Sequence, residues 1–150
     1  MNEVHILLVE DNEGDIFLTT EALEEGKIVN KVSIARDGEE AIDFLLKKVK
    51  VGISELPDLI LLDVNLPKRN GQEVLQFIKT NQNLKHIPVI ILTTSSSEKD
   101  IVQSYTNQAN CFITKPVEVD NFLKVVKSIE NFWISIVTLP TNTNEKQDEG

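Results

Sequence analysis

The sequence predicts an α/β fold in which helices cover both faces of a parallel β-sheet. Short runs such as Leu59–Leu62 and Val89–Leu92 are apolar at every position, which is typical of strands buried on both faces. Strand and helix patterns alternate along the chain, as parallel strands joined by helical crossovers require. The 150 residues suffice for one core and not comfortably for two. We therefore expect one domain at residues 1–140, with an extended last helix, and a disordered polar tail at residues 141–150.

The first half of the chain contains three predicted strands. The elements are, in order, a strand at Val4–Val9, a helix at Asp15–Glu24, a strand at Lys31–Ala35, a helix after Asp37-Gly38 and a strand at Leu59–Leu62. Helical spacing predicts that Ile16, Thr20 and Leu23 share the inward face of the first helix, with Phe17 beside them. Gly26 is a plausible stop for that helix.

The second half continues the alternation after a long connection. Lys47–Pro57 exceeds the roughly two to six residues that usually join a helix to a strand. A helix at Gly71–Asn81 comes next, followed by a strand at Val89–Leu92 that Pro88 precedes. A helix after Ser95–Ser97 has Ile101, Val102 and Tyr105 on its apolar side. The last elements are a strand at Cys111–Thr114 and a helix from Val119 to at least Trp133, with Pro140 ending that helix.

Composition narrows the classes of function. A net charge of −9 disfavours direct nucleic-acid binding, because the phosphate backbone attracts lysine and arginine. The apolar runs are far shorter than the roughly 18 residues that a membrane span needs, so we expect no membrane insertion. The single cysteine, Cys111, and the absence of a visible secretory signal fit the cytoplasm.

Polar and charged residues stand where four of the predicted strands end. They are Glu10 and Asp11, Asp63, Thr93, and Lys115 with Pro116. The carboxyl ends of parallel strands form one ligand crevice, so these side chains are expected to converge. Carboxylates that lie close together repel unless one is protonated or a cation neutralises them. Oxygen ligands of high negative charge suit Mg²⁺, and the lack of cysteine and histidine in the group argues against zinc.

The same residues suit phosphoryl chemistry. Asp63 can act as a covalent nucleophile toward phosphorus. A bound metal would offset the charge of the incoming group, Lys115 would add a second cation, and the Thr93 hydroxyl can donate a hydrogen bond. Phosphoryl transfer needs little more from a protein than positioning and charge stabilisation.

Five short motifs in chain order resemble the receiver domain of two-component response regulators. They are Val9-Glu10-Asp11-Asn12, Leu61-Leu62-Asp63-Val64-Asn65-Leu66-Pro67, Asn70-Gly71, Leu92-Thr93-Thr94-Ser95, and Phe112-Ile113-Thr114-Lys115-Pro116. The resemblance covers about residues 4–134. It implies a flavodoxin-like five-stranded sheet of order 2-1-3-4-5, which would place the ends of the first and third strands side by side at the switch point.

The resemblance also implies a role for each residue of the site. Asp63 would be the phosphoacceptor, assisted by Lys115 and Thr93. Mg²⁺ would be held by the side chains of Glu10, Asp11 and Asp63 and by the backbone carbonyl of Asn65. Thr93 and Phe112 would form the switch, and the Lys115–Pro116 peptide bond would be cis. The only catalysis implied is that of the protein's own phosphorylation and dephosphorylation.

Three further features resemble the receivers that serve phytochrome histidine kinases. They are the long Lys47–Pro57 connection, the Thr93–Ser96 run, and Phe132-Trp133 continuing to Leu139-Pro140. This implies a histidine kinase, of phytochrome type, as the phosphodonor. A homodimer is an alternative assembly, either through the last helix or through the face of helix 4, strand 5 and helix 5. Phe132-Trp133 is equally consistent with a core pair and with a dimer patch.

Other functions remain to be weighed against this hypothesis. An interaction module could keep the receiver fold while working independently of phosphorylation. A phosphatase or phosphotransferase with an aspartyl nucleophile usually has a second carboxylate two residues later, where this chain has Asn65. Residues with ordinary structural roles are also present: Asp11-Asn12 can cap the first helix, and His5 and His86 are expected to be structural or surface residues.

Overall fold

The structure is a computed structural model that describes residues 4–27, 31–64, 66, 68, 70–93 and 111–127. Strands and helices alternate through this part of the chain. The elements are β1 (His5–Val9), α1 (Glu13–Gly26), β2 (Lys31–Ala35), α2 (Gly38–Val51), a short 3₁₀ helix η1 (Ile53–Glu55), β3 (Leu59–Asp63), α3 (Gly71–Thr80), β4 (Val89–Thr93), β5 (Cys111–Thr114) and α5 (Val119–Lys127).

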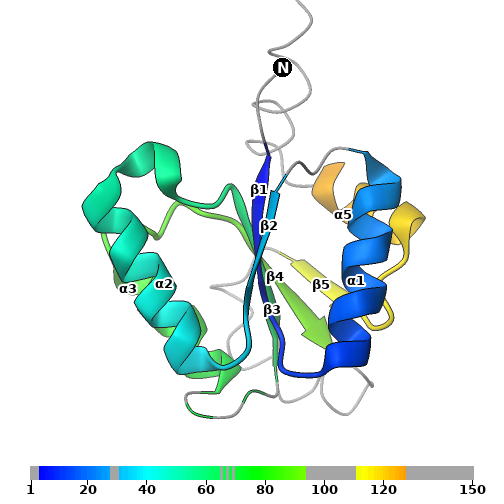
Figure 1. Ribbon diagram of the computed structural model, residues 1–150, viewed down its shortest axis with the longest axis horizontal. Helices are drawn as coiled ribbons and strands as arrows, with labels where there is room; N and C mark the ends of the chain where they lie inside the picture. The colour runs from blue at the N-terminus through cyan, green and yellow to red at the C-terminus, as the bar shows by residue number, and fades with distance from the viewer. Residues whose placement is uncertain are drawn as a thin grey trace, which may run out of the picture.

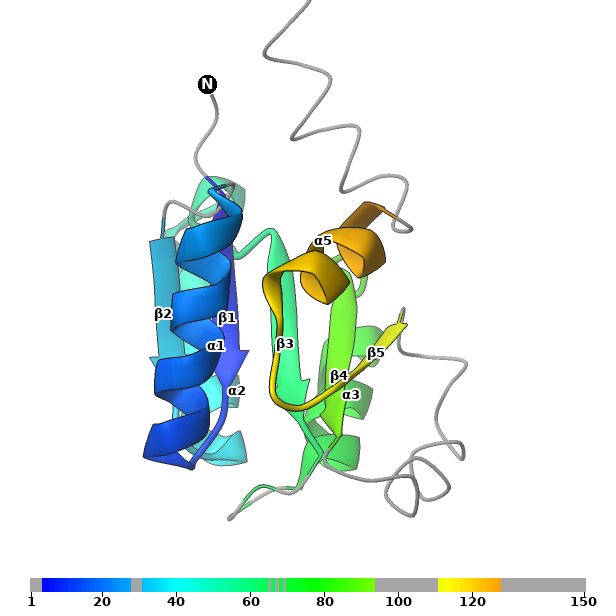
Figure 2. The same ribbon diagram turned by 90° about the vertical axis from the view of Figure 1, so that its right-hand side faces the viewer.

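The five strands form one parallel sheet in the order β2-β1-β3-β4-β5. This confirms the predicted fold class and strand order. Seen along the sheet, α2 and α3 lie on one side, and α1 and α5 lie on the other (Figure 1). The view turned by 90° shows α1 and α5 in front of the sheet, with β2 at one edge and β5 at the other (Figure 2).

The two faces of the sheet bury separate apolar clusters. Alternate strand residues such as Leu7, Ile60 and Ile91 pack with α2 and α3, whereas their neighbours Leu8 and Leu61 pack with α1 and α5. Period-two alternation in a strand sends successive side chains to opposite faces. Because both faces are covered, β1, β3 and β4 are buried at every position, as the uninterrupted apolar runs predict.

Polar side chains fix where three of the helices begin. The carboxamide of Asn12 accepts the backbone N–H of Asp15 at α1, and Asp37 accepts that of Glu40 at α2. At α3, Asn70 and Glu73 form a reciprocal capping box. Such caps satisfy N–H groups that the first helical turn leaves unpaired. The three helices therefore start at defined residues just beyond the carboxyl ends of their strands.

Of two predictions about the first helix, the stop at Gly26 is confirmed and the place of Phe17 is wrong. Helix α1 runs from Glu13 to Gly26, so Gly26 is its last residue, and the left-handed conformation that ends it falls on Lys27 (φ 63°). Phe17 is 61% exposed and does not join the inward face, because the inward positions are Ile16, Thr19, Ala22 and Leu23. Thr20 lies four residues after Ile16, and its hydroxyl donates a hydrogen bond to the Ile16 carbonyl instead of packing in the core.

The predicted connection at Lys47–Pro57 is largely helical. Helix α2 continues to Val51, and η1 follows after Gly52, whose φ of 143° suits glycine. Strands β3 and β4 each run one residue further than predicted, to Asp63 and Thr93. The helix predicted around Ile101, the Phe132-Trp133 pair and the tail lie outside the described residues. Within those residues, no helix combines the length and apolar character of a membrane span.

Candidate functional site

The carboxyl ends of β1, β3, β4 and β5 bring five of the predicted site residues together. Glu10 directly follows β1, and its backbone N–H donates to the Ala35 carbonyl at the end of β2 (2.9 Å). Asp63 and Thr93 are the last residues of β3 and β4. Lys115 follows β5, and its backbone N–H donates to the Thr93 carbonyl (2.6 Å). The parallel ladder thus aligns residues that are far apart in sequence.

Three carboxylates form an acidic cluster at this edge. Glu10, Asp11 and Asp63 each offer an oxygen, and these oxygens lie within 4.8 Å of one another. Glu10 and Asp63 are buried and Asp11 is exposed. One carboxylate open to solvent beside two buried ones suits Mg²⁺, which takes one or two carboxylates and keeps several waters. The donor set and its charge therefore fit a hard divalent cation.

The ammonium group of Lys115 lies against the acidic cluster. Its Nζ donates to Glu10 Oε1 (3.0 Å) and to Asp15 Oδ2 (2.9 Å), and it lies 3.4 Å from Asp63 Oδ1. Burial acts to lower the pKa of Lys115, but the hydrogen bonds to Asp15 and Glu10 and the charge of Asp63 outweigh it, so the pKa lies above its ordinary value. Lys115 therefore stays a cation beside Asp63.

Thr93 places a hydroxyl in the same region without a partner among the described residues. The residue is fully buried, and its Oγ1 makes no hydrogen bond there. A buried hydroxyl without a hydrogen bond costs about 1–3 kcal/mol, so an incoming oxygen acceptor would relieve a penalty already present. This orphaned donor fits a site that receives an oxyanion.

Phe112 lies one strand away from Thr93, in β5. Its ring is half-buried and packs against the apolar cluster on the α2–α3 side of the sheet, the cluster to which Ile91 also belongs. In the register of the two strands, Phe112 pairs with Ile91, and Ile91 lies two residues before Thr93. Side chains two apart in a strand share a face, so Thr93 and Phe112 project toward the same side of the sheet.

Two further predictions concern the backbone. The Lys115–Pro116 peptide bond is cis in this structure. Asn65, the predicted carbonyl ligand, lies outside the described residues, so its position relative to the acidic cluster is not described.

Asp15 is a site residue that sequence reasoning missed. Its carboxylate makes the shorter of the two hydrogen bonds to Lys115, yet it comes from the first turn of α1 and not from a strand end. The prediction treated Asp15 only as the start of a helix. The signal that could have found it is its place: the first turn of a helix that directly follows β1 lies at the same edge as the crevice.

The chain belongs to the response regulator receiver domain family, which its residues 6–127 match. It is 47% identical over 135 residues to the response regulator Rcp1 of Synechocystis sp. (strain ATCC 27184 / PCC 6803 / Kazusa), a match that covers 90% of this chain and 92% of Rcp1. This confirms the family that the five motifs resemble.

Solved structures show the same fold. The phosphorylated cyanobacterial phytochrome response regulator RcpA is 46% identical with a TM-score of 0.70, and the match covers 93% of this chain and all 100% of RcpA. The Mn²⁺-bound form of Rcp1 is 45% identical with a TM-score of 0.67, covering 91% of this chain and 99% of Rcp1. A relative that binds a divalent metal, together with the acidic cluster, supports the predicted Mg²⁺ cofactor.

Proposed function

We propose that Asp63 is the residue that accepts a phosphoryl group, and that the donor is the phosphohistidine of a histidine kinase. A carboxylate oxygen of Asp63 attacks phosphorus, the P–N bond to the donor imidazole breaks, and the imidazole keeps the electron pair and takes up a proton. The observation that carries this proposal is the position of Asp63, which is buried, belongs to the acidic cluster and lies 3.4 Å from the Lys115 ammonium.

The neighbours of Asp63 divide the remaining work. Bound Mg²⁺ would be held by Glu10, Asp11 and Asp63, and it would neutralise charge on the transferred group. Lys115 provides a cation from the α1 side of the site, and Thr93 provides a hydroxyl to a phosphoryl oxygen. The only reactions in this proposal are the phosphorylation and dephosphorylation of the protein itself.

The acyl phosphate would then change a surface for partner proteins. Thr93 moves toward the phosphoryl group, and Phe112, which projects toward the same face of the sheet, repacks into the space that Thr93 leaves. Such a switch is a shift in population, because the phosphoryl group interacts better with one arrangement than with the other. A module that keeps the fold but works independently of phosphorylation is the alternative function.

The test is the intact mass of the protein after incubation with phosphoramidate, with and without Mg²⁺. We expect a Mg²⁺-dependent gain of one phosphoryl group in wild type and in Asp43→Asn, whose carboxylate is exposed on α2. We expect no gain in Asp63→Asn. Equal labelling of Asp63→Asn and wild type would refute the assignment, and unchanged partner binding by Asp63→Asn would favour the phosphorylation-independent module.

For the partner, we propose a kinase of phytochrome type, as the names of the phytochrome response regulator RcpA and of the bacteriophytochrome response regulator AtBRR suggest. AtBRR is 44% identical with a TM-score of 0.74, covering 85% of this chain and 93% of AtBRR. Such a role would place the protein in the cytoplasm. A second copy of the chain remains an alternative partner, through the last helix or the face of helix 4, β5 and α5, and light scattering with and without beryllofluoride would test it.

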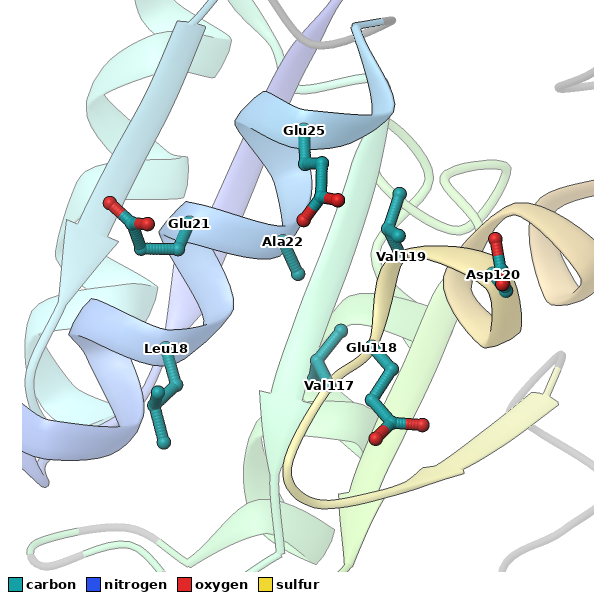
Figure 3. A pocket seen from close by; sticks show the side chains of 8 residues that line it. All are labelled: Leu18, Glu21, Ala22, Glu25, Val117, Glu118, Val119 and Asp120. Carbon is teal, nitrogen blue, oxygen red and sulfur yellow. The ribbon is translucent and has the colours of Figure 1, made fainter.

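A groove beside the site offers a place for the kinase to dock. It lies between α1 and the segment that leads into α5, where Ala22 and Glu25 face Val117 and Val119 (Figure 3). Apolar residues line it together with four carboxylates, those of Glu21, Glu25, Glu118 and Asp120. A lining that mixes apolar side chains with carboxylates is complementary to a helix that carries both apolar and basic side chains.

Replacing acidic residues of this groove by lysine tests kinase docking separately from the phosphorylation reaction at Asp63. In Glu21→Lys/Glu25→Lys we expect the rate of phosphotransfer from an autophosphorylated phytochrome-type kinase to fall by about tenfold, because steering of the partner is lost. Phosphorylation by phosphoramidate should not change. The matched control is Glu39→Lys/Asp43→Lys on α2, across the sheet from the groove. An equal loss in both double variants would argue against the groove.

A further inference from the structure

The shortest polar contact of the site's lysine is with a residue outside the acidic cluster. Lys115 Nζ lies 2.9 Å from Asp15 Oδ2, 3.0 Å from Glu10 Oε1 and 3.4 Å from Asp63 Oδ1. The side chain of Lys115 is 8% exposed and that of Glu10 is 0% exposed, whereas that of Asp15 is 31% exposed. Lys115 therefore has one partner that is open to water and two that are buried.

Both ends of the Asp15–Lys115 pair are held by the backbone. The N–H of Asp15 donates to Asn12 Oδ1 (2.8 Å) in the cap of α1, and the N–H of Lys115 donates to the Thr93 carbonyl (2.6 Å). Only the side chains are left to move. The carboxylate of Asp15 also lies in the first turn of α1, where the helix dipole stabilises a negative charge even without a cation beside it.

These differences determine which contact gives way when an anion reaches Asp63. A phosphoryl group brings about −1.5 to −2 charges next to an ammonium that already has three carboxylate neighbours. Glu10 is fully buried, so its charge needs a cation beside it, either Lys115 or the bound Mg²⁺. Asp15 can instead be hydrated, and the helix dipole supports its charge. The bond to Asp15 is therefore the one that Lys115 exchanges for the new anion.

We propose that Asp15 is a positioning residue that competes with the phosphoryl group for Lys115. In the unmodified protein Asp15 holds the ammonium at the α1 side of the site, and phosphorylation transfers the ammonium from Asp15 to the phosphoryl oxygens. Asp15 thereby lowers the stability of the phosphorylated state relative to the unmodified one, and it sets how readily the protein returns to the unmodified arrangement. This inference rests on the proposed function of Asp63.

The first measurement is the affinity for beryllofluoride in the presence of Mg²⁺, followed by ¹⁹F NMR. In Asp15→Asn we expect binding to tighten by about fivefold, a modest coupling for groups that share one ion-pair network. Asparagine keeps the backbone N–H that Asn12 accepts. The matched control is Glu13→Gln, which removes a charge from the same turn of α1 but from a carboxylate that pairs with Arg36. We expect Glu13→Gln to bind as wild type does.

A double-mutant cycle shows whether Asp15 acts through Lys115. We expect Asp15→Asn to have no effect on beryllofluoride binding in a Lys115→Gln background. The same fivefold gain in that background, a gain of equal size in Glu13→Gln, or weaker binding by Asp15→Asn would each overturn the proposal. Wild type that fails to bind beryllofluoride at all would overturn the proposed function, and the role of Asp15 with it.

A second readout is the NMR signals of the two side chains, measured first without beryllofluoride and then with it. In the unmodified protein, the ¹⁵Nζ resonance of Lys115 should shift in Asp15→Asn and stay in place in Glu13→Gln, because Asp15 contacts that nitrogen whereas Glu13 pairs with Arg36. On addition of beryllofluoride to wild type, the carboxyl ¹³C resonance of Asp15 should move toward that of a hydrated carboxylate. An Asp15 resonance that does not respond to beryllofluoride would overturn the exchange.

Discussion

The two ends of β1 each bury an ionisable side chain, but they surround it differently. At the amino end, His5 Nε2 lies 2.8 Å from Ser33 Oγ, its backbone N–H donates to Asp58 Oδ2 (2.9 Å), and its ring meets Phe44 edge-on at 6.1 Å. At the carboxyl end, Glu10 shares one ammonium with two other carboxylates. The first arrangement is satisfied by the chain itself.

The carboxyl end differs because its charges and hydrogen bonds are unbalanced. Three carboxylates of the acidic cluster and Asp15 face one lysine, and the Thr93 hydroxyl has no partner among the described residues. Buried polar groups are normally satisfied, so an exception points to a ligand or a functional role. From this comparison we expect the amino end to contribute to stability without a ligand, and the carboxyl end to gain stability when ligands bind.

Of the changes that test the difference between the two ends, Gly71→Ala at the carboxyl end is expected to have the largest effect on the free energy of unfolding. A Cβ at Gly71 would lie 2.9 Å from the carbonyl oxygen of Asp63 and 3.0 Å from that of Val64. Backbone atoms cannot move aside as a flexible side chain can, so we expect a loss of about 3 kcal/mol in the free energy of unfolding. Urea denaturation measures it, and Mg²⁺-dependent phosphorylation should fall with it because Asp63 is displaced.

Gly26→Ala is the matched control for that substitution. Its Cβ would meet Val119 Cγ2 at 3.5 Å, an ordinary contact, and alanine favours a helix over glycine. We expect stability equal to or slightly above that of wild type. If Gly71→Ala were as stable as Gly26→Ala, close packing of α3 on the end of β3 would not position Asp63.

Mg²⁺ is expected to have the next largest effect, and only through the carboxyl end. A cation that binds the folded state alone stabilises it by about 1.4 kcal/mol at ten times its Kd. We expect this gain in wild type and in His5→Gln, and a much smaller gain in Asp11→Asn, which loses a carboxylate of the acidic cluster. Thermal unfolding over a Mg²⁺ titration measures it. Equal gains in Asp11→Asn and wild type would place the cation elsewhere.

The smallest effect is a pH dependence at the amino end. Burial lowers the pKa of His5. The positive charges of Lys31 and Lys48 lower it further, and the negative charges of Asp58 and Glu55 act in the opposite direction. A histidine with a folded pKa below its unfolded value of 6.5 binds protons more readily when unfolded. Its contribution to stability is thus complete above pH 6.5 and is lost as the pH falls from 6.5 toward the folded pKa.

The variant His5→Gln isolates this contribution. Glutamine can still bond to Ser33 but does not titrate. We expect the difference in unfolding free energy between wild type and His5→Gln to decrease between pH 7.5 and pH 5.5 in urea melts without Mg²⁺. A difference that is constant over this range would show that His5 is equally protonated in both states.

The sheet could be predicted from the sequence because its strands carry a strong signal. Runs such as Leu59–Leu62 are apolar at every position, and each ends at a charged or hydroxyl residue. The α1 face was harder to predict. Phe17 is apolar, and its hydrophobicity suggested a buried side chain. It lies outside the 100° stripe that contains Ile16 and Leu23, so helical spacing, applied strictly, excludes it from the buried face.

The candidate site was predictable to the extent that strand ends define it. The place of Asp15 at the edge of the crevice was predictable, but its contact was not, because that contact depends on where the side chain of Lys115, which follows β5, reaches. Helix α1 ends at Gly26 as predicted, but the left-handed residue at its end, usually a glycine, is Lys27. A one-dimensional pattern does not contain the tertiary contact that gives Asp15 its role.

The backbone hydrogen bond from Lys115 to Thr93 has a consequence for how such proteins can diversify. It fixes the spacing between the backbones of the two residues through the sheet and not through the residues between them along the chain. Substitutions at positions 94–110 can therefore leave the backbone spacing of the two anion-sensing residues unchanged, because the sheet sets it. The backbone of the site and the sequence between β4 and β5 are in this sense separately mutable.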